Sequence, residues 1–94
     1  MPMITTIVLV QAEPSTIPRT AAALAAIDGV AEVYSVSGAW DLVAIVRVPQ
    51  LDDIARIVTE RMTTVPGIQR TQTLTAFRAY SRGDLEQAFD IGVS

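Results

Sequence analysis

A glycine, an aromatic residue and a carboxylate lie together between two apolar segments, in the stretch VSGAWDL from Val36 to Leu42. Gly38 tolerates the backbone conformations of a tight turn and lets a ligand approach the main-chain N–H groups closely. Asp41 can meet an ammonium group, and Ala39 and Trp40 can form a wall beside it. The same residues also suit a plain hairpin turn, in which the aspartate bonds its own backbone. Both interpretations, a turn and the lip of a binding pocket, stay open at this point.

A second polar feature is the segment TQTLT, in which Thr71, Thr73 and Thr75 alternate with other residues. At the two-residue period of a strand, these three hydroxyl groups share one face. The β-propensity of threonine explains them without a ligand. A row of hydroxyls can also hold a small polar molecule, and the spacing does not separate the two interpretations.

The composition excludes several kinds of chemistry. The chain has no histidine and no cysteine, which removes histidine-based catalytic triads, zinc sites and disulfides from this chain alone. We find no phosphate-binding loop and no acid–base pair at catalytic spacing, so we expect no enzyme activity, no cofactor and no metal. The net charge is −3 and the seven basic residues, all arginine, are scattered, so we expect no direct binding of nucleic acid.

The apolar patterns that must position these residues predict four strands and two helices in one domain. The predicted strands are Met3–Val10, Val30–Ser37, Leu42–Val48 and Ile68–Tyr80. One helix starts at a cap, Ser15 or Thr16, and ends at Gly29, and the second covers Leu51–Val65. This order, β-α-β-β-α-β, predicts an α+β fold, a ferredoxin-like plait with both helices on one face of an antiparallel sheet. We assign residues 1–80 to this domain and 81–94 to a short helical tail. The tail is either a packed or frayed chain end or an oligomer contact through Leu85 and Phe89.

The third predicted strand is apolar on both faces, with Val43 and Ile45 opposite Leu42, Ala44 and Val46. Half of all residues are hydrophobic, although the longest apolar run has only seven residues, against roughly 20 in a membrane-spanning helix. No signal peptide is recognisable, so we expect a cytoplasmic protein without a membrane segment. The second face of the sheet is then best covered by the sheet of another copy, which predicts a sheet-on-sheet dimer.

Two segments resemble the signatures of a known family. The run AAIDGVAEVYSVSGAWDLV from Ala25 to Val43 is similar to the Lrp/AsnC ligand-binding domain, also called the RAM domain, in its helix, Gly-Val, strand and Gly-x-aromatic-Asp-Leu. The run VPGIQRTQT from Val65 to Thr73 is similar to that family's Pro-Gly-Val/Ile and Thr-x-Thr signature. The resemblance covers about residues 3 to 80.

The resemblance implies dimers paired by their sheets, which commonly assemble into larger rings, often octamers. It implies a small effector, usually an amino acid, bound in clefts where dimers meet. Gly38 and Asp41 would then line the cleft with Ala39 and Trp40, and Thr71 and Thr73 would contribute further. Full regulators of this family carry an N-terminal helix-turn-helix domain, whereas here the first strand begins by Met3. The chain therefore resembles a stand-alone effector domain that senses an amino acid or modulates a full-length relative by mixed assembly.

Three other interpretations share the predicted fold. A small dimeric α+β-barrel enzyme, a monooxygenase or an isomerase, usually places acid–base or haem-binding groups, often including histidine, between sheet and helices, and this chain has no histidine. An ACT-type module tends to use a glycine-containing loop after its first strand, where this chain has Gln11-Ala12-Glu13-Pro14. An assembly scaffold that binds no ligand is the last alternative.

Overall fold

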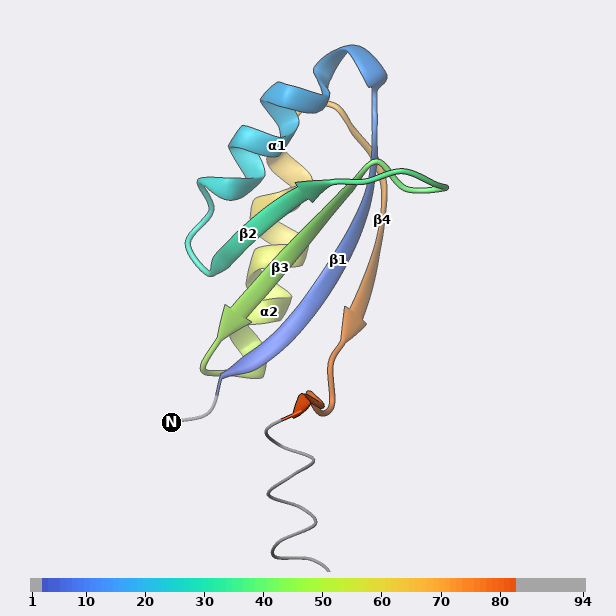
Figure 1. Cartoon of the computed structure of the whole chain (residues 1–94). Coiled ribbons are helices and arrows are strands. Elements are labelled where there is room, and N and C mark those ends of the chain that lie inside the picture. Colours follow the sequence, from blue (N-terminus) through green and yellow to red (C-terminus); the bar gives the residue numbers. More distant parts are fainter. Residues whose placement is uncertain (1–2, 83–94) are drawn as a thin grey trace, which may run out of the picture.

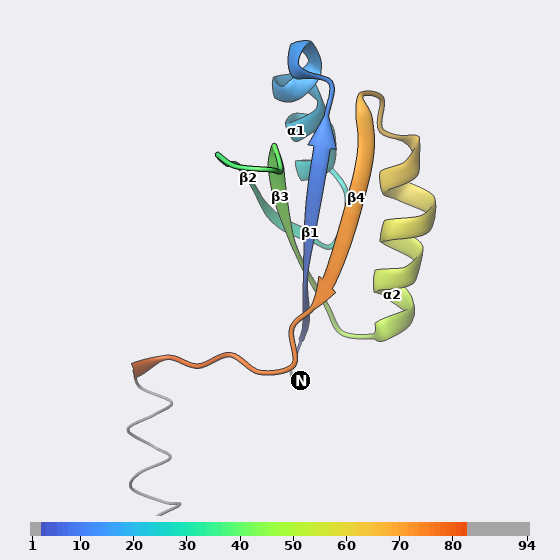
Figure 2. The ribbon, with the colours of Figure 1, turned by 90° about the vertical axis from the view of Figure 1, so that its right-hand side faces the viewer.

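The computed structural model describes residues 3–82 as a four-stranded sheet with two helical segments on one face (Figures 1 and 2). The strands are β1 (Ile4–Ala12), β2 (Val30–Ser35), β3 (Leu42–Val48) and β4 (Ile68–Thr75). Helix α1 (Ile17–Ala25) follows the 3₁₀ turn η1 (Pro14–Thr16), and α2 (Leu51–Arg56) continues into the π-helical turn η2 (Ile57–Arg61) and the 3₁₀ turn η3 (Met62–Thr64). The predicted ferredoxin-like plait is confirmed, while the predicted tail helix from Asp84 lies outside the described residues.

The sheet has the order β2-β3-β1-β4, and every neighbouring pair is antiparallel. Within residues 3–82, the helices cover one face of the sheet and no layer covers the other face, as Figure 2 shows. The covered face holds the core of the described chain: Val8, Val10, Ala12, Leu24, Leu42, Ala44, Val46, Val48, Ile54, Ile57 and Met62. The uncovered face, here called the open face, carries the half-buried residues Ile7, Leu9, Val43 and Ile45. The predicted pair of apolar faces on β3 is therefore present.

Three strands end at other residues than predicted, because a strand ends where its neighbouring strand no longer supplies hydrogen-bond partners. β1 continues past Val10, since Gln11 and Ala12 pair with Arg70 and Ile68 of β4. β4 ends at Thr75 instead of Tyr80, because β1 begins at Ile4 and supplies only one further bond, from the Ala76 N–H to the Thr5 carbonyl (2.9 Å). β2 ends two residues early, at Ser35.

The helical segments also depart in detail from regular α-helices. Thr16 occupies the N-cap position of α1, one of the two predicted positions, but its hydroxyl donates to the Glu13 carbonyl (2.8 Å) and makes no capping bond to the helix. In the second segment, Thr59 and Thr63 donate to carbonyls four residues earlier, and such bonds tend to bend helices. This segment changes from α to π geometry at Ile57. In the part of the chain that the structure describes, no helix has the length and apolar character needed to cross a membrane.

The turn between η3 and β4 is tied to α1. Gly67 has a φ of +94°, and its carbonyl accepts the Glu13 N–H (2.8 Å). The buried Thr20 hydroxyl donates to the Pro66 carbonyl (2.9 Å). A Cβ placed on Gly67 would lie 2.3 Å from Thr16 Oγ1 and 2.6 Å from Thr20 Oγ1, so only glycine fits here. This contact fixes the start of β4 beside the end of β1.

We expect Gly67→Ala to lower the free energy of unfolding by about 2 kcal/mol or more, because the methyl group meets two stiff threonines at an unfavourable φ. Gly38→Ala is the matched control, since Gly38 has a φ of +115° but no atom within 4 Å of an added Cβ. It should cost only about 1 kcal/mol. Urea unfolding at one fixed protein concentration measures both losses, and equal losses would contradict this description of the Gly67 turn.

Candidate functional site

The loop between β2 and β3 forms the first candidate site. The Val36 N–H donates to the Asp41 carbonyl (3.0 Å), and the Asp41 N–H donates to the Val10 carbonyl (2.9 Å). Gly38 adopts the positive φ that the sequence led us to expect of a turn glycine. Gly38 and Ala39 are exposed, so this loop presents an accessible strip of backbone at one end of the sheet.

The side chain of Asp41 bonds to β1 and not to its own turn. The Ala12 N–H donates to Asp41 Oδ2 (2.9 Å), at the point where the register between β1 and β4 shifts. Such irregularities leave backbone groups outside the ladder and often lie beside functional sites. Gln11 Nε2 adds a bond to the Ala39 carbonyl (2.9 Å). Within residues 3–82, the other carboxylate oxygen of Asp41 has no hydrogen-bond partner, so it is available to a ligand.

Trp40 is half-buried, and the guanidinium carbon of Arg70 lies 5.0 Å from the centroid of its ring. A cation over an indole face at this distance is a favourable cation–π contact. Arg70 pairs in register with Gln11. Gln11 follows Val10, whose buried side chain points to the helix side. Because successive strand residues point to opposite faces, Gln11 and its partner Arg70 lie on the open face. The loop thus combines an aromatic ring, a carboxylate and a guanidinium.

The two predicted threonines lie elsewhere. Thr71 pairs in register with Val10 and Thr73 with Val8, and both valines are fully buried on the helix side. Antiparallel partners point to the same face, so these threonines lie on the face opposite Arg70. Thr71 lines a pocket of about 280 Å³ between η2, η3 and the start of β4. One copy therefore gathers Gly38, Ala39, Trp40 and Asp41, but not Thr71 and Thr73, into one site.

Sequence reasoning missed two members of this site, Gln11 and Arg70. Their types carry no signal by themselves, because glutamine and arginine are ordinary on exposed strand positions. Only the pairing of β1 with β4 brings them to the loop, and that pairing joins residues 59 apart in the chain. Knowledge of the strand register would have predicted both.

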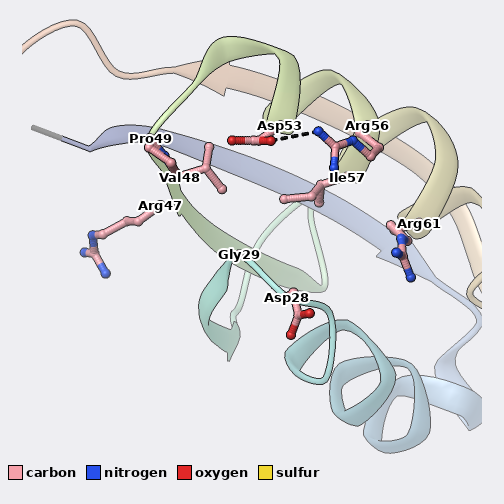
Figure 3. A pocket seen from close by; sticks show the side chains of 9 residues that line it. All are labelled: Asp28, Gly29, Arg47, Val48, Pro49, Asp53, Arg56, Ile57 and Arg61. Carbon is pink, nitrogen blue, oxygen red and sulfur yellow. Dashed lines mark hydrogen bonds and ion pairs between the residues drawn. The ribbon is translucent and has the colours of Figure 1, made fainter. Parts of the chain in front are cut away.

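A second candidate site lies between the end of α1 and the second helical segment, as Figure 3 shows. This pocket, of about 330 Å³, is lined by Asp28, Gly29, Arg47, Val48, Pro49, Asp53, Arg56, Ile57 and Arg61. Arg56 pairs with Asp53 (2.8 Å), and Arg47 pairs with Glu32 outside the pocket (3.2 Å). Among residues 3–82, neither Asp28 nor Arg61 forms an ion pair. No motif in the sequence pointed to Arg56 or Arg61.

A cluster of three side chains on β2 and β3 marks the far edge of the open face. Glu32 accepts hydrogen bonds from Tyr34 (2.5 Å) and Arg47 (3.2 Å). The Tyr34 hydrogen bond, followed by that of Arg47, lowers the pKa of Glu32, and the bond to Glu32 raises the pKa of Tyr34. The cluster is accessible to solvent, and the charge of Glu32 is balanced by that of Arg47. It therefore resembles the polar rim of an interface.

The chain belongs to the Lrp/AsnC ligand-binding domain family, whose model matches residues 5–85. The family is described by ligand binding. One similar protein is an uncharacterised HTH-type transcriptional regulator of Pyrococcus horikoshii, PH1916, 34% identical over 76 residues. That match covers 78% of this chain and 51% of the regulator, so the chain spans about half the length of this relative.

Solved structures share the fold. The protein TTHA0845 from Thermus thermophilus superposes with a TM-score of 0.80 at 42% identity, covering 85% of this chain and all of that one (100%). The transcriptional regulator NMB0573 of Neisseria meningitidis, solved as a complex with L-Met, has a TM-score of 0.74 at 12% identity, covering 84% of this chain and 53% of that one. At that identity the second likeness concerns the fold alone.

We expect Asp41→Ala to lower the free energy of unfolding by about 1–3 kcal/mol, because the N–H of buried Ala12 then loses its acceptor. Asp41→Asn keeps an oxygen acceptor at the same place and should cost less than about 1 kcal/mol. Chemical unfolding of the two variants beside the wild type checks this. Similar losses for both variants would show that the Ala12 bond does not stabilise the loop.

Proposed function

We propose that the chain is a regulatory domain that binds an α-amino acid at the loop containing Gly38, Ala39, Trp40 and Asp41. The observation that carries the proposal is a carboxylate and a guanidinium beside one aromatic ring: Asp41 follows Trp40 in the loop, and Arg70 lies over the Trp40 ring. Asp41 offers a carboxylate oxygen to an ammonium group, and Arg70 offers a guanidinium to a carboxylate. An α-amino acid carries both groups at neutral pH, and Trp40 can contact its side chain.

Family membership supports the ligand class. NMB0573, which shares the fold, was solved with L-Met, an amino acid with an apolar side chain. The loop of one copy faces open space, since an added Cβ at Gly38 meets no atom within 4 Å. We propose that another copy supplies the opposite wall of the cleft. The family resemblance implies clefts where dimers meet, and we propose that Thr71 and Thr73 of a neighbouring copy contribute there.

The open face supports assembly through paired sheets. Its centre is apolar, with Ile7, Leu9, Val43 and Ile45 half-buried, and Tyr34 and Leu74 are 50% and 42% exposed. An antiparallel sheet that faces water normally presents polar residues on that side. We propose a homodimer in which two open faces pack together, and an assembly of such dimers into a ring such as an octamer.

The matched regulators suggest what the domain does once it binds its ligand. They are about one and a half times as long as this chain, since the same match covers 78% of this chain and 51% of each regulator, and they carry the HTH-type designation. We propose that the domain modulates a full-length regulator of the family by mixed assembly, in the cytoplasm, without contacting DNA itself. Ligand binding would then shift the balance between mixed and pure oligomers.

Calorimetry against the twenty L-amino acids, L-Met included, tests the ligand. We expect at least one to bind, and Asp41→Asn to weaken that binding by roughly 1.5–3 kcal/mol, the scale of a charged hydrogen bond, or about 10- to 150-fold. Arg61→Gln is the control, since it alters the pocket between the helices and should leave affinity unchanged. Silence across the panel from an assembled protein would contradict the ligand class. Loss of binding in Arg61→Gln alone would move the site to the pocket of Figure 3.

Sedimentation velocity tests the dimer. Ile45→Lys places a charge at the centre of the open face, where a monomer tolerates it and a sheet-paired dimer must bury it. We expect a folded monomer at concentrations at which the wild type is dimeric. Leu51→Lys, on the helix side at a residue 64% exposed, should remain dimeric. A dimer that survives Ile45→Lys would place the interface elsewhere.

A further inference from the structure

After β4 the chain leaves the sheet and continues as an extended arm, defined here as residues 76–80. Its last bond to the sheet runs from the Ala76 N–H to the Thr5 carbonyl (2.9 Å). Figure 2 shows the arm turning to the open-face side, away from both helical segments. The loop between β2 and β3 projects to the same side at the other end of the sheet. The open face is thus framed at both ends.

The arm carries two aromatic side chains that are largely open to water. Phe77 is 100% exposed and Tyr80 is 71% exposed. The whole chain has only two phenylalanines, two tyrosines and one tryptophan, so two of five aromatic residues lie on this short segment. An aromatic side chain typically buries about 150–250 Å² when it packs, and such residues dominate protein interfaces. Exposed apolar groups that gather in this way mark an interaction surface.

We infer that the arm packs against a second copy of this chain and latches the sheet-paired dimer. The inference rests on the dimer proposed above, and it adds a contact outside the sheet faces. Two sheets packed face to face lie about 10 Å apart. Five extended residues reach about 17 Å. An arm that starts in one sheet on its open side therefore spans the gap and reaches the partner's sheet.

Its own copy is a poor partner for the arm. Phe77 makes no contact that hides it from water, and the arm would have to reverse its direction to reach the helix side. A two-fold axis between the sheets gives each copy one arm and one receiving surface, so both arms contribute to one closed interface. The apolar arm also continues the apolar open face through Leu74 of β4, which is 42% exposed and registers with Ile7.

The double variant Phe77→Ser, Tyr80→Ser tests whether the arm stabilises the dimer. We expect its dimer to dissociate at a concentration roughly 100-fold higher than the wild type, since aromatic residues central to interfaces commonly contribute factors of this size. Leu51→Ser removes a similarly exposed apolar side chain from the helix side and should leave the dimer unchanged. Circular dichroism confirms the fold of each variant. An unchanged dissociation constant in the double variant overturns the latch.

Photo-crosslinking distinguishes a partner copy from the arm's own copy without removing an aromatic group. Phe77 is replaced by p-benzoylphenylalanine, and ¹⁴N- and ¹⁵N-labelled proteins are mixed and exchanged before irradiation. Crosslinked peptides that join a light and a heavy chain support the latch, whereas crosslinks only within one isotope overturn it. A wild type that stays monomeric at tens of micromolar contradicts the proposed dimer itself. A dimer whose Phe77 crosslinks only to its own chain contradicts the latch alone.

Discussion

The hydrogen bond from the Ala12 amide to the Asp41 carboxylate joins the end of β1 to the loop between β2 and β3, and the candidate site depends on it. The carboxylate accepts a backbone group at the register shift between β1 and β4, which would otherwise be left unpaired. Trp40, the neighbour of Asp41 in this loop, lies against Arg70 of β4, with 5.0 Å between the guanidinium carbon and the ring centroid. The aspartate therefore has a structural role, and only its second oxygen is available for recognition. The two interpretations of the turn, structural and functional, are compatible because they use different atoms.

The placement of both helical segments on one face of the sheet determines which surface is left for other contacts. Because both helical segments lie on one face, the open face keeps an apolar centre exposed to water, with polar groups such as Glu32 and Arg47 at its edge. The loop with Trp40 and the arm with Phe77 project on this same side. The proposed ligand site and the proposed dimer face are therefore neighbouring surfaces, and in this proposal a ligand in the loop alters the contact between copies.

The sequence predicted the order of elements, because apolar periodicity and turn residues act locally. It identified the loop of Gly38 and Asp41 for the same reason, as a polar break between apolar strands. The sequence did not predict the strand register. The pairing of Val10 with Thr71 puts the threonines on the helix side. The pairing of Gln11 with Arg70 brings an arginine to Trp40. The end of β4 was also misjudged, since a strand ends where its partner does. Strand register and strand ends depend on contacts between segments that are distant in the chain, so neither segment predicts them alone.

The most direct test of the amino-acid site is a ¹⁵N NMR titration of the assembled protein with L-Met, followed at the Ala12 amide and the Trp40 indole. The Ala12 N–H donates to the carboxylate of Asp41, which we propose binds the ammonium group of the ligand. Trp40 precedes Asp41 in the loop. We predict that both signals shift and saturate together with the Arg70 amide signal. Shifts confined to Asp28, Gly29 and Arg61 in the pocket between the helices, or no shifts with any of the twenty amino acids, would contradict it.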